Sequence, residues 1–324
     1  MAGRMKLSII IVSWNVEADV LDCLRSIRQN PPSEPFEVIL VDNASSDGTV
    51  EAVRRDFAET VVIANAGNRG FAAANNQALA VAKGQYLLLL NPDTLVHPHA
   101  LDLLVEYVES HPDVGACGPR LLNRDGTTQL SVRHFPSIRA SLYRHTSLRY
   151  LGLFRGQYKK ALMKDFSHDR RMDVDIVKGA ALIVRRSVID RIGPLDEAFF
   201  MYYEEADLCL RIRKAGWRVV FLADAVVTHT GGRSSDKAGM DRRIMRLRSL
   251  VMFIGKHRSR LTTVLFVCVL APTLLLRYLG DLIAGICAFL YAKVMRRQAL
   301  RERSAAKIKG AAFLLWKWPW RLPA

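Results

Sequence analysis

Cysteine is scarce and unpaired in this chain of 324 residues. The 5 cysteines stand at positions 23, 117, 209, 268 and 287, far apart and never in a C-x-x-C pair. This pattern argues against a disulfide framework and against a cysteine-based zinc site, because both use cysteines at characteristic spacings. We therefore expect a protein of a reducing compartment.

A secretory signal peptide and a dinucleotide-binding glycine motif are also missing. The first apolar run, Leu7 to Val12, is too short for a signal peptide and leads into polar residues. Those residues, SWNVEAD, contain no glycine, whereas G-x-G-x-x-G is needed for the close approach of a pyrophosphate. We expect a cytoplasmic catalytic part that is not a dinucleotide-binding Rossmann domain.

Acidic residues are few only near the C-terminal end. From Lys237 onward the chain carries 18 Lys and Arg against Asp241, Asp281 and Glu302, whereas the first 236 residues carry 29 basic against 28 acidic side chains. The net charge of +16 therefore belongs to the tail. This distribution favours an anionic membrane surface as the partner of the tail and gives no reason to expect nucleic acid.

Short apolar runs alternate with helical patterns over the first 120 residues, which is typical of an α/β sheet built from βαβ units. The predicted strands are Leu7 to Val12, Phe36 to Val41, Val61 to Ala64, Gln85 to Leu90 and Val114 to Cys117. The predicted helices are Val20 to Arg28, Thr49 to Phe57, Phe71 to Ala82 and Pro98 to Ser110.

Polar clusters follow four of these strands, at the sheet edge where ligands bind in open α/β folds. They contain Ser13, Asn15 and Glu17 after the first strand, Asp42 and Asn43 after the second, Asn68 to Gly70 after the third, and Asn91 and Asp93 after the fourth. Asp42 can accept a base N–H, Arg69 can contact diphosphate and Asp93 can hold a divalent cation. Each cluster alone can equally be a turn, but four on one edge indicate a nucleotide diphosphate site.

A second informative region runs from Asp175 to Gly232. The spacing of its apolar residues predicts a helix that begins near Glu204 and ends before Gly216. Glu204, Glu205 and Asp207 fall in the first turn of this helix. The helix dipole favours acidic residues in the first turn. They can serve only to stabilise the helix N-terminus, or the dipole can keep one of their carboxylates ionised so that it acts as a base.

Seven motifs occur in an order and spacing that resemble the family 2 glycosyltransferases, in particular the bacterial rhamnosyltransferase-like branch that builds surface polysaccharides. They are VSWN, VDNASSDGT, NRGFAAANN, LLLLNPDT, GAALIVRR, YEEADLCLRIRKAGW and VTHTGG, and they cover about Lys6 to Lys256. The resemblance implies a GT-A fold, with a mainly parallel, Rossmann-like sheet flanked by helices. It also implies an inverting transfer of a sugar from a nucleotide diphosphate sugar to a hydroxyl group.

The resemblance further implies roles for the residues at the sheet edge. Asp42 would read the base, with Ser13, Asn15, Glu17 and Asn43 beside it, and Arg69 would contact the nucleotide. Asn91 and Asp93 occupy the family's D-x-D position, with asparagine in place of the first aspartate. Asp93 and His229 would then hold Mg²⁺ or Mn²⁺ together with donor phosphates and water.

Glu205 stands where the family has the aspartate that serves as general base. Glu204 or Asp207 could instead supply the base or position the acceptor, and the residues do not separate these roles. The predicted acceptor-binding residues are Gly179, Ala180, Glu204 and Asp207.

The chain is predicted to consist of a catalytic domain, residues 1–255, and a basic, apolar helical region, residues 256–324, that associates with membranes. Residues 120–173 are expected to form a variable insertion on the acceptor side. In the tail, Leu261 to Leu276 and Leu282 to Ala292 are apolar runs separated by RYLGD, and Pro272 should kink the first. Neither run reaches the ~20 residues of a spanning helix.

The basic flanks of these runs favour a shallow hairpin or in-plane helices on the cytoplasmic face of the plasma (inner) membrane, peripheral or monotopic. Trp316, Trp318 and Trp320 would lie in the headgroup layer. The expected acceptor is a lipid-linked saccharide and the donor sugar is rhamnose, with other hexoses open. A nucleotidyltransferase and a non-enzymatic basic membrane- or nucleic-acid-binding protein are the alternatives. The pattern indicates no oligomeric state.

Overall fold

The computed structural model describes residues 5–231 and 242–317. The chain divides into two compact units, the first formed by Met1–Phe135 with Leu162–Ser249 and the second by Pro136–Ala161 with Leu250–Ala324. The division falls inside helix α10 (Arg242–His257). Residues 136–161, which the sequence analysis assigned to the catalytic part, thus group with the C-terminal helices.

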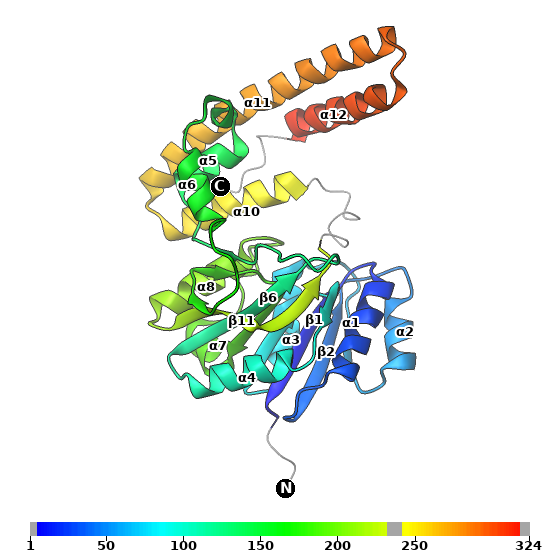
Figure 1. Ribbon diagram of the computed structural model, residues 1–324, viewed down its shortest axis with the longest axis vertical. Helices are drawn as coiled ribbons and strands as arrows, with labels where there is room; N and C mark the ends of the chain where they lie inside the picture. Colours follow the sequence, from blue (N-terminus) through cyan, green and yellow to red (C-terminus); the bar gives the residue numbers. More distant parts are fainter. Residues whose placement is uncertain (1–4, 232–241, 318–324) are drawn as a thin grey trace. The chain divides into compact units, whose positions relative to one another are not determined.

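The first unit contains a mixed sheet with the strand order β3-β2-β1-β4-β10-β6-β11-β5, and β8 pairs with β11 (Figure 1). Its strands are β1 (Leu7–Ser13), β2 (Phe36–Asp42), β3 (Val61–Ala64), β4 (Tyr86–Leu90), β5 (Thr94–Val96), β6 (Val114–Leu122), β8 (Met172–Asp173), β10 (Ala181–Arg185) and β11 (Arg218–His229). The longest ladders, β1 with β2 and β6 with β11, are parallel, whereas β10 is antiparallel to both of its neighbours. A separate two-stranded sheet pairs β7 (Val132–Arg133) with β9 (Ile176–Val177).

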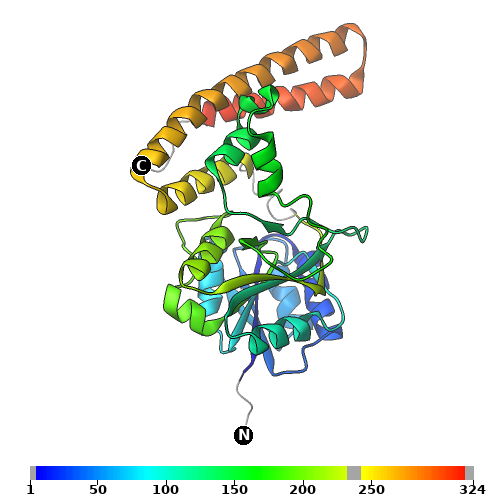
Figure 2. The same ribbon diagram turned by 60° about the vertical axis from the view of Figure 1, so that its left-hand side comes forward.

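Helices cover both faces of this sheet (Figures 1 and 2). They are α1 (Glu17–Gln29), α2 (Thr49–Asp56), α3 (Phe71–Val81), α4 (Ala100–Ser110), α7 (Arg186–Ile192) and α8 (Glu204–Lys214). Because helices lie on both sides, β4 is apolar on both faces, and every residue of its YLLLL run is buried. The continuous apolar run thus marks the centre of the sheet.

The elements agree with the predicted α/β pattern apart from a few boundaries. The fourth predicted helix begins at Ala100 rather than Pro98, because His99 adopts a left-handed conformation (φ 61°) that separates the proline from the helix. The last predicted strand continues from Cys117 to Leu122, since β11 pairs with its second half. The short strand β5 was not predicted.

The second unit is helical. Its elements are α5 (Ile138–His145), the 3₁₀ helix η1 (Ser147–Leu151), α6 (Arg155–Ala161), the second half of α10, α11 (Arg260–Val294) and α12 (Gln298–Lys317). Helices α11 and α12 run side by side as a hairpin (Figure 2). Gly285 permits their close approach, because a Cβ atom at this position would lie 2.9 Å from the side chain of Ile308.

The predicted interruption of the tail by RYLGD is wrong, because α11 continues through it, with Pro272 inside the helix. The charges of the interruption are neutralised within the unit: Asp281 lies 3.3 Å from Lys307 of α12 and 3.9 Å from Arg277 one turn earlier. By length and composition, α11 is able to cross a membrane, and 22% of its most apolar window is buried. Trp318 and Trp320 lie outside the described residues, and of Trp316 only the backbone is described.

Candidate active site

The carboxyl ends of β1 and β2 carry a compact hydrogen-bond network around Asp42. The register pairs Ser13 with Asp42, and the Ser13 hydroxyl donates to Asp42 Oδ1 over 2.8 Å. Ser45 donates its hydroxyl to Oδ1 over 2.5 Å and its backbone N–H to Oδ2 over 2.8 Å. Asp42 is 1% exposed. Its carboxylate therefore fixes the strand ends and the loop that follows β2.

Two neighbouring predicted residues belong to the same loop system. Asn15 adopts a left-handed conformation (φ 53°), and its side-chain oxygen accepts the backbone N–H of Ser46 over 2.7 Å. The backbone N–H of Glu17 donates to Asp47 Oδ2 over 3.0 Å at the start of α1. The loops after β1 and β2 are thereby tied to each other.

The loop after β3 joins this edge through Asn43. The Asn43 amide donates to the Gly70 carbonyl over 3.2 Å, and its oxygen accepts the backbone N–H of Arg69 over 3.4 Å. The Arg69 side chain itself is exposed. Gly70 (φ 85°) is required here, since a Cβ atom would lie 2.6 Å from the Phe200 carbonyl. The Arg69 loop therefore packs against the segment that leads into α8.

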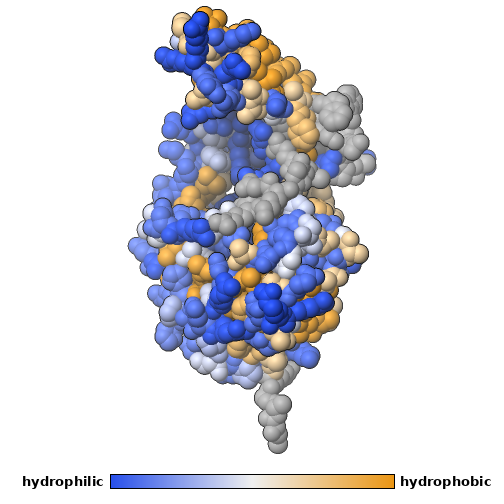
Figure 3. Space-filling model, turned by 90° about the vertical axis from the view of Figure 1, so that its right-hand side faces the viewer, coloured by the Kyte–Doolittle hydropathy of each residue, from blue (hydrophilic) through white to orange (hydrophobic). Residues whose placement is uncertain are grey.

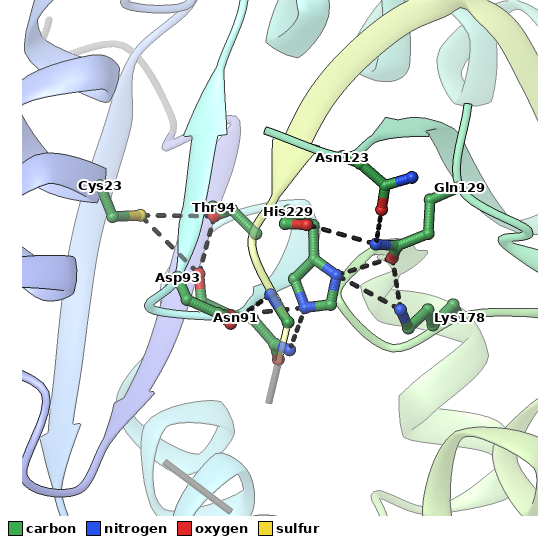
Figure 4. Close-up of polar contacts among 9 residues, drawn as sticks. Cys23, Asn91, Asp93, Thr94, Asn123, Gln129, Lys178 and His229 are labelled. Atoms are coloured by element: carbon green, nitrogen blue, oxygen red, sulfur yellow. Dashed lines mark hydrogen bonds and ion pairs between the residues drawn. The ribbon is translucent and has the colours of Figure 1, made fainter. Parts of the chain in front are cut away.

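Asp93 and His229 face each other at the end of β4 and β11 (Figure 4). Asp93 Oδ1 lies 3.4 Å from His229 Nε2, and Asn91 Nδ2 lies 3.3 Å from the same nitrogen. The backbone N–H of Gly231 donates to Asp93 Oδ2 over 2.8 Å. Asp93 is 9% exposed and His229 is 4% exposed. Asp93 and His229, whose side chains are of types that commonly bind metals, are thus held close together and nearly buried.

The electrostatic surroundings favour the ionised form of Asp93. Burial by itself opposes the charge, but the neighbouring His229 ring, together with the Gly231 N–H, outweighs it and lowers the pKa of the Asp93 carboxyl. A cation at this position would act in the same sense. Among the described residues, no three side chains of the His, Cys, Asp and Glu types gather into a metal cluster.

Three residues that the sequence analysis missed surround the other side of His229. Gln129 Oε1 accepts from His229 Nδ1 over 2.8 Å, and the Lys178 ammonium donates to the same oxygen. Gln129 Nε2 in turn donates to Asn123 Oδ1 over 2.8 Å. Asn123 and Gln129 come from the segment that was expected to vary on the acceptor side. The available signal was Lys178, a lysine between the apolar Ile176–Val177 and the GAALIV run.

Lys178 has no carboxylate bonded to it among the contacts that the structure gives. Burial and the positive charge of Arg133 lower the pKa of its ammonium to about 8, against the attraction of Asp93 and Glu205. A lysine kept in such surroundings is costly to stability.

The segment Lys178–Ala180 connects the Asp93 pocket with α8. The backbone N–H of Asn91 donates to the Ala180 carbonyl over 2.9 Å. Next to it, the space beside Gly179 is filled by Glu205, whose Cβ would lie 3.3 Å from a Cβ at that position. A side chain at residue 179 would therefore push Glu205 away. The structure brings Asn91, Asp93, His229, Gly179, Ala180 and Glu205 together.

Glu204 and Glu205, the first two residues of α8, are adjacent carboxylates that each have one oxygen without a hydrogen-bond donor. Tyr202 and Tyr203 before them both have positive φ, at 72° and 71°, which is costly for bulky residues. Oε2 of Glu204 and Oε2 of Glu205 are buried without a hydrogen-bond partner. Burial, and next the charge of Glu205, raise the pKa of Glu204 well above its usual value. Glu204 is buried whereas Glu205 is partly exposed, so the two adjacent carboxyls differ in their environment.

Asp207 has a different position. Its side chain is fully buried, and its Oδ2 accepts from Arg211 Nε over 2.8 Å. Arg211 also donates to the backbone carbonyls of Ile192, Gly193 and Pro194. This geometry gives the Asp207 carboxylate a structural role in anchoring α8 and favours the other two acids for contact with substrate.

Comparison with known proteins identifies the family. The profile described as glycosyl transferase family 2 matches residues 8–177. The chain belongs to this family. It is a glycosyltransferase, and the nucleotidyltransferase and non-enzymatic alternatives fall away.

Curated relatives agree with the rhamnosyltransferase-like branch. The chain is 28% identical over 239 residues to an N-acetylglucosaminyl-diphospho-decaprenol L-rhamnosyltransferase of Mycobacterium tuberculosis, which covers 69% of this chain and 76% of the relative. It is 30% identical over 224 residues to the rhamnosyltransferase WbbL of Escherichia coli, with 66% and 79% covered.

Solved structures confirm the GT-A fold of this glycosyltransferase. The mannosyltransferase PcManGT from Pyrobaculum calidifontis, in complex with GDP-Man and Mn²⁺, superposes with a TM-score of 0.57 at 19% sequence identity. The match covers 97% of this chain and 88% of that one. At this identity the likeness concerns the fold.

Proposed function

We propose that this glycosyltransferase moves rhamnose, with inversion, from a nucleotide diphosphate sugar to a hydroxyl group of a lipid-linked saccharide in cell-surface polysaccharide synthesis. The names of the two rhamnosyltransferase relatives support the sugar, and the name of the mycobacterial one supports a polyprenyl diphosphate saccharide as acceptor. The observation that carries the proposal is the Lys178–Ala180 segment, which holds Asn91 on one side and lies against Glu205 on the other.

The proposed donor site is the edge formed by the ends of β1 to β4. Ser13, Asn15, Glu17, Asp42 and Asn43 would surround the base and ribose, and the exposed Arg69 would reach the diphosphate. The Asp42 network supports this role by fixing the loops, because a preformed site loses little entropy when the nucleotide binds. A bidentate guanidinium is well suited to phosphate oxygens.

The residues at the Asp93 pocket fit a divalent cation. Asp93 supplies an ionised carboxylate and His229 an imidazole nitrogen on the same side, 3.4 Å apart. With asparagine at 91, the protein offers one carboxylate at this position, so donor phosphates and water would complete the shell of Mg²⁺ or Mn²⁺. The ion would supply positive charge to the departing diphosphate.

Glu205 is the proposed general base. Its unpaired oxygen would accept the proton of the acceptor hydroxyl while the hydroxyl oxygen forms a bond to the anomeric carbon. The bond from that carbon to the diphosphate oxygen breaks on the opposite face, so the configuration inverts. Gly179 and Ala180, with Glu204 behind Glu205, would shape the acceptor side.

A single assay tests this proposal. The purified full-length chain is incubated with dTDP-rhamnose, UDP-glucose, UDP-galactose or GDP-mannose, an N-acetylglucosaminyl diphosphate polyprenol acceptor, and either Mg²⁺ or Mn²⁺. We expect nucleoside diphosphate release and a disaccharide lipid of inverted configuration with dTDP-rhamnose. Preference for another donor would refute rhamnose alone, and product formed in excess EDTA would refute the metal.

We also propose that α11 lies in the plane of the cytoplasmic leaflet. Its exposed large apolar residues recur every three or four positions along the helix, and Figure 3 shows apolar side chains gathered over the C-terminal helices. They are Leu261, Val264, Leu265, Val269, Leu275, Leu276, Leu279, Ile283, Ile286, Leu290, Tyr291 and Val294. Arg277 and Asp281 are turned into the unit, with side chains 19% and 24% exposed.

This apolar stripe supports in-plane binding over a crossing. At about 1.5 Å per residue it extends roughly 50 Å, well beyond the ~30 Å hydrocarbon core. The basic residues that flank it favour anionic lipids. Flotation with anionic vesicles tests the idea: Leu276→Glu or Ile283→Glu should weaken binding and the two together should abolish it, whereas Gln298→Glu, which adds one such charge on exposed α12, should not weaken it. Binding that survives the double variant and resists alkaline extraction would instead indicate a spanning helix.

A further inference from the structure

The turn after β6, residues Asn123 to Gln129, forms a directed chain of hydrogen bonds that ends on His229 (Figure 4). Neither the family comparison nor the roles proposed above assign this turn. A neutral imidazole can carry its hydrogen on either ring nitrogen, and its neighbours decide which one. The donors and acceptors of the turn settle this choice for His229.

The chain begins at the Asp125 carboxylate, which accepts hydrogen bonds and does not donate them. The Thr127 hydroxyl therefore donates to Asp125 Oδ1 over 2.6 Å, which leaves Thr127 Oγ1 to accept from Asn123 Nδ2 over 2.9 Å. With its amide group so oriented, Asn123 presents its oxygen to Gln129 Nε2, 2.8 Å away. Gln129 then has its oxygen toward His229 Nδ1.

Two further contacts fix Gln129 in the same orientation independently. Its Nε2 donates to the backbone carbonyl of His229 over 3.3 Å, and a carbonyl can only accept. Its Oε1 receives the ammonium of Lys178, which can only donate. A flipped Gln129 amide would place donor against donor and acceptor against acceptor at all of these contacts.

We propose that Gln129, oriented by Asn123 and Lys178, is a positioning residue that holds the hydrogen of His229 on Nδ1 and so keeps the Nε2 lone pair directed toward Asp93 and Asn91. The role of this lone pair rests on the proposed metal function. Asn91 agrees with the assignment, because its Nδ2 lies 3.3 Å from Nε2 and can donate to a lone pair there. Lys178 Nζ also lies 3.3 Å from Nδ1, but its closer contact is the hydrogen bond that it donates to Gln129 Oε1.

The chemistry of the pocket gives this assignment its purpose. A nitrogen binds a metal through its lone pair, so the opposite tautomer, with hydrogen on Nε2, would close the position that faces Asp93. Residues that orient a metal-binding histidine through its other nitrogen typically change metal affinity by about 10- to 100-fold when replaced. The 120–173 segment, expected to serve the acceptor, would then serve the donor side through its first ten residues.

Nitrogen NMR of the full-length chain labelled with ¹⁵N-histidine tests the tautomer directly, without substrate or metal. The His229 signals are identified by their loss in His229→Ala. Wild type should show hydrogen on Nδ1. Gln129→Glu keeps an acceptor at the same place and should retain this state, whereas Gln129→Met, of similar length but without an acceptor for Nδ1–H, should lose it.

Binding of Mn²⁺ alone, followed by electron paramagnetic resonance of the free ion, gives the second measurement. Gln129→Met should weaken Mn²⁺ binding by about 10- to 100-fold, and Gln129→Glu should stay within a few fold of wild type. Asn123→Leu leaves Gln129 in place and should shift both measurements in the same direction as Gln129→Met, but by less. It is the variant to use if circular dichroism shows that Gln129→Met does not fold.

Hydrogen on Nε2 in wild type, or hydrogen retained on Nδ1 with unchanged Mn²⁺ binding in both Gln129→Met and Asn123→Leu, would overturn the proposal. A wild-type protein that binds no Mn²⁺ would refute the metal function, and the nitrogen spectra would still decide the tautomer. The two proposals can therefore fail separately.

Discussion

The pocket around His229 and the first turn of α8 lie next to each other but differ in whether their buried polar groups have hydrogen-bond partners. In the pocket, Asp93, His229 and Gln129 all have hydrogen-bond partners. In the first turn, the Oε2 atoms of Glu204 and Glu205 are buried without one. The Gly179 backbone lies against Glu205 and follows directly after Lys178, which reaches the pocket.

Under the roles proposed above, the difference separates a group that would hold a ligand from a group that would react. Partners on every side fix the orientation of a side chain, which is what a metal ligand requires. A buried carboxylate oxygen without a donor costs stability, about 1 to 3 kcal/mol, and is rarely left in that state without a reason. An acceptor hydroxyl, which brings its own hydrogen, would satisfy Glu205 at the moment of reaction.

The largest effect that tests this comparison is expected for Glu205→Gln. The amide keeps the shape but cannot take up a proton, so turnover should fall by about 10² to 10⁴ while nucleotide-sugar binding is kept. Initial rates and donor binding by calorimetry measure the two quantities. Glu204→Gln is the matched control, with the same change one residue earlier, and should lose far less. Near-normal turnover of Glu205→Gln would move the base to Glu204.

The next effect concerns the pocket. Asp93→Asn removes the charge of the proposed metal ligand without changing its size, and it should lower Mn²⁺-stimulated activity on the order of 10², because the ion supplies several kcal/mol of charge stabilisation. His229→Ala should act in the same direction. Activity titrated against Mn²⁺ in wild type and both variants measures this effect. Full activity of wild type in excess EDTA would contradict it.

The sequence was sufficient for the sheet because its signals are local. A buried run such as YLLLL, followed by Asn91, Pro92 and Asp93, marks both a central strand and its carboxyl end. The end of each parallel strand then lies at one edge, as the pairing of Ser13 with Asp42 shows. The nearness of Asp93 to His229 was implied by the resemblance alone.

The structure supplies the physical reason for that nearness. The three-residue strand β5 begins directly after Asp93 and pairs with the end of β11, so that Thr94 lies opposite His229. A strand of this length carries no periodic signal, and its pairing joins residues more than a hundred positions apart. The contact between Gln129 and His229 also joins residues 100 positions apart, so no local pattern indicated it.

The tail shows a different limit of sequence patterns. Arg277 and Asp281 appeared to divide the apolar run, because charges inside a helix are costly when they lack partners. The partner, Lys307, lies on the next helix. The packing of α12 along α11 therefore adds a second partner for Asp281, beside Arg277 one turn earlier on α11.

A smaller effect, on stability, is expected for Glu204→Gln. The pKa of Glu204 is raised in the folded state, so folding is most favoured below the unfolded pKa of about 4.5 and loses stability as pH rises toward the folded value. The amide does not titrate. Glu204→Gln should therefore gain on wild type above pH ~4.5, by about 1 to 3 kcal/mol at the plateau. Urea unfolding from pH 4 to 8 measures the gain, and a gain that is the same at every pH would contradict this reading.

The smallest effect is expected for Asn91→Asp, which restores the carboxylate of the family's D-x-D position. A second carboxylate near His229 Nε2 adds charge for a cation, but it removes the Asn91 amide from that nitrogen and repels Asp93. These terms largely offset each other, so Mn²⁺ binding should tighten by only a few fold, about 1 kcal/mol or less. Manganese titration measures it.

Asn123→Asp makes the same chemical change in the turn after β6, where its oxygen can still accept from Gln129, and it should leave Mn²⁺ binding nearly unchanged. Weaker binding in Asn91→Asp alone would mean that the amide of Asn91, through its contact with His229, matters more to the pocket than an added charge. The metal site would then depend on hydrogen-bonded orientation, which is the property that separates it from the unpaired carboxylates of α8.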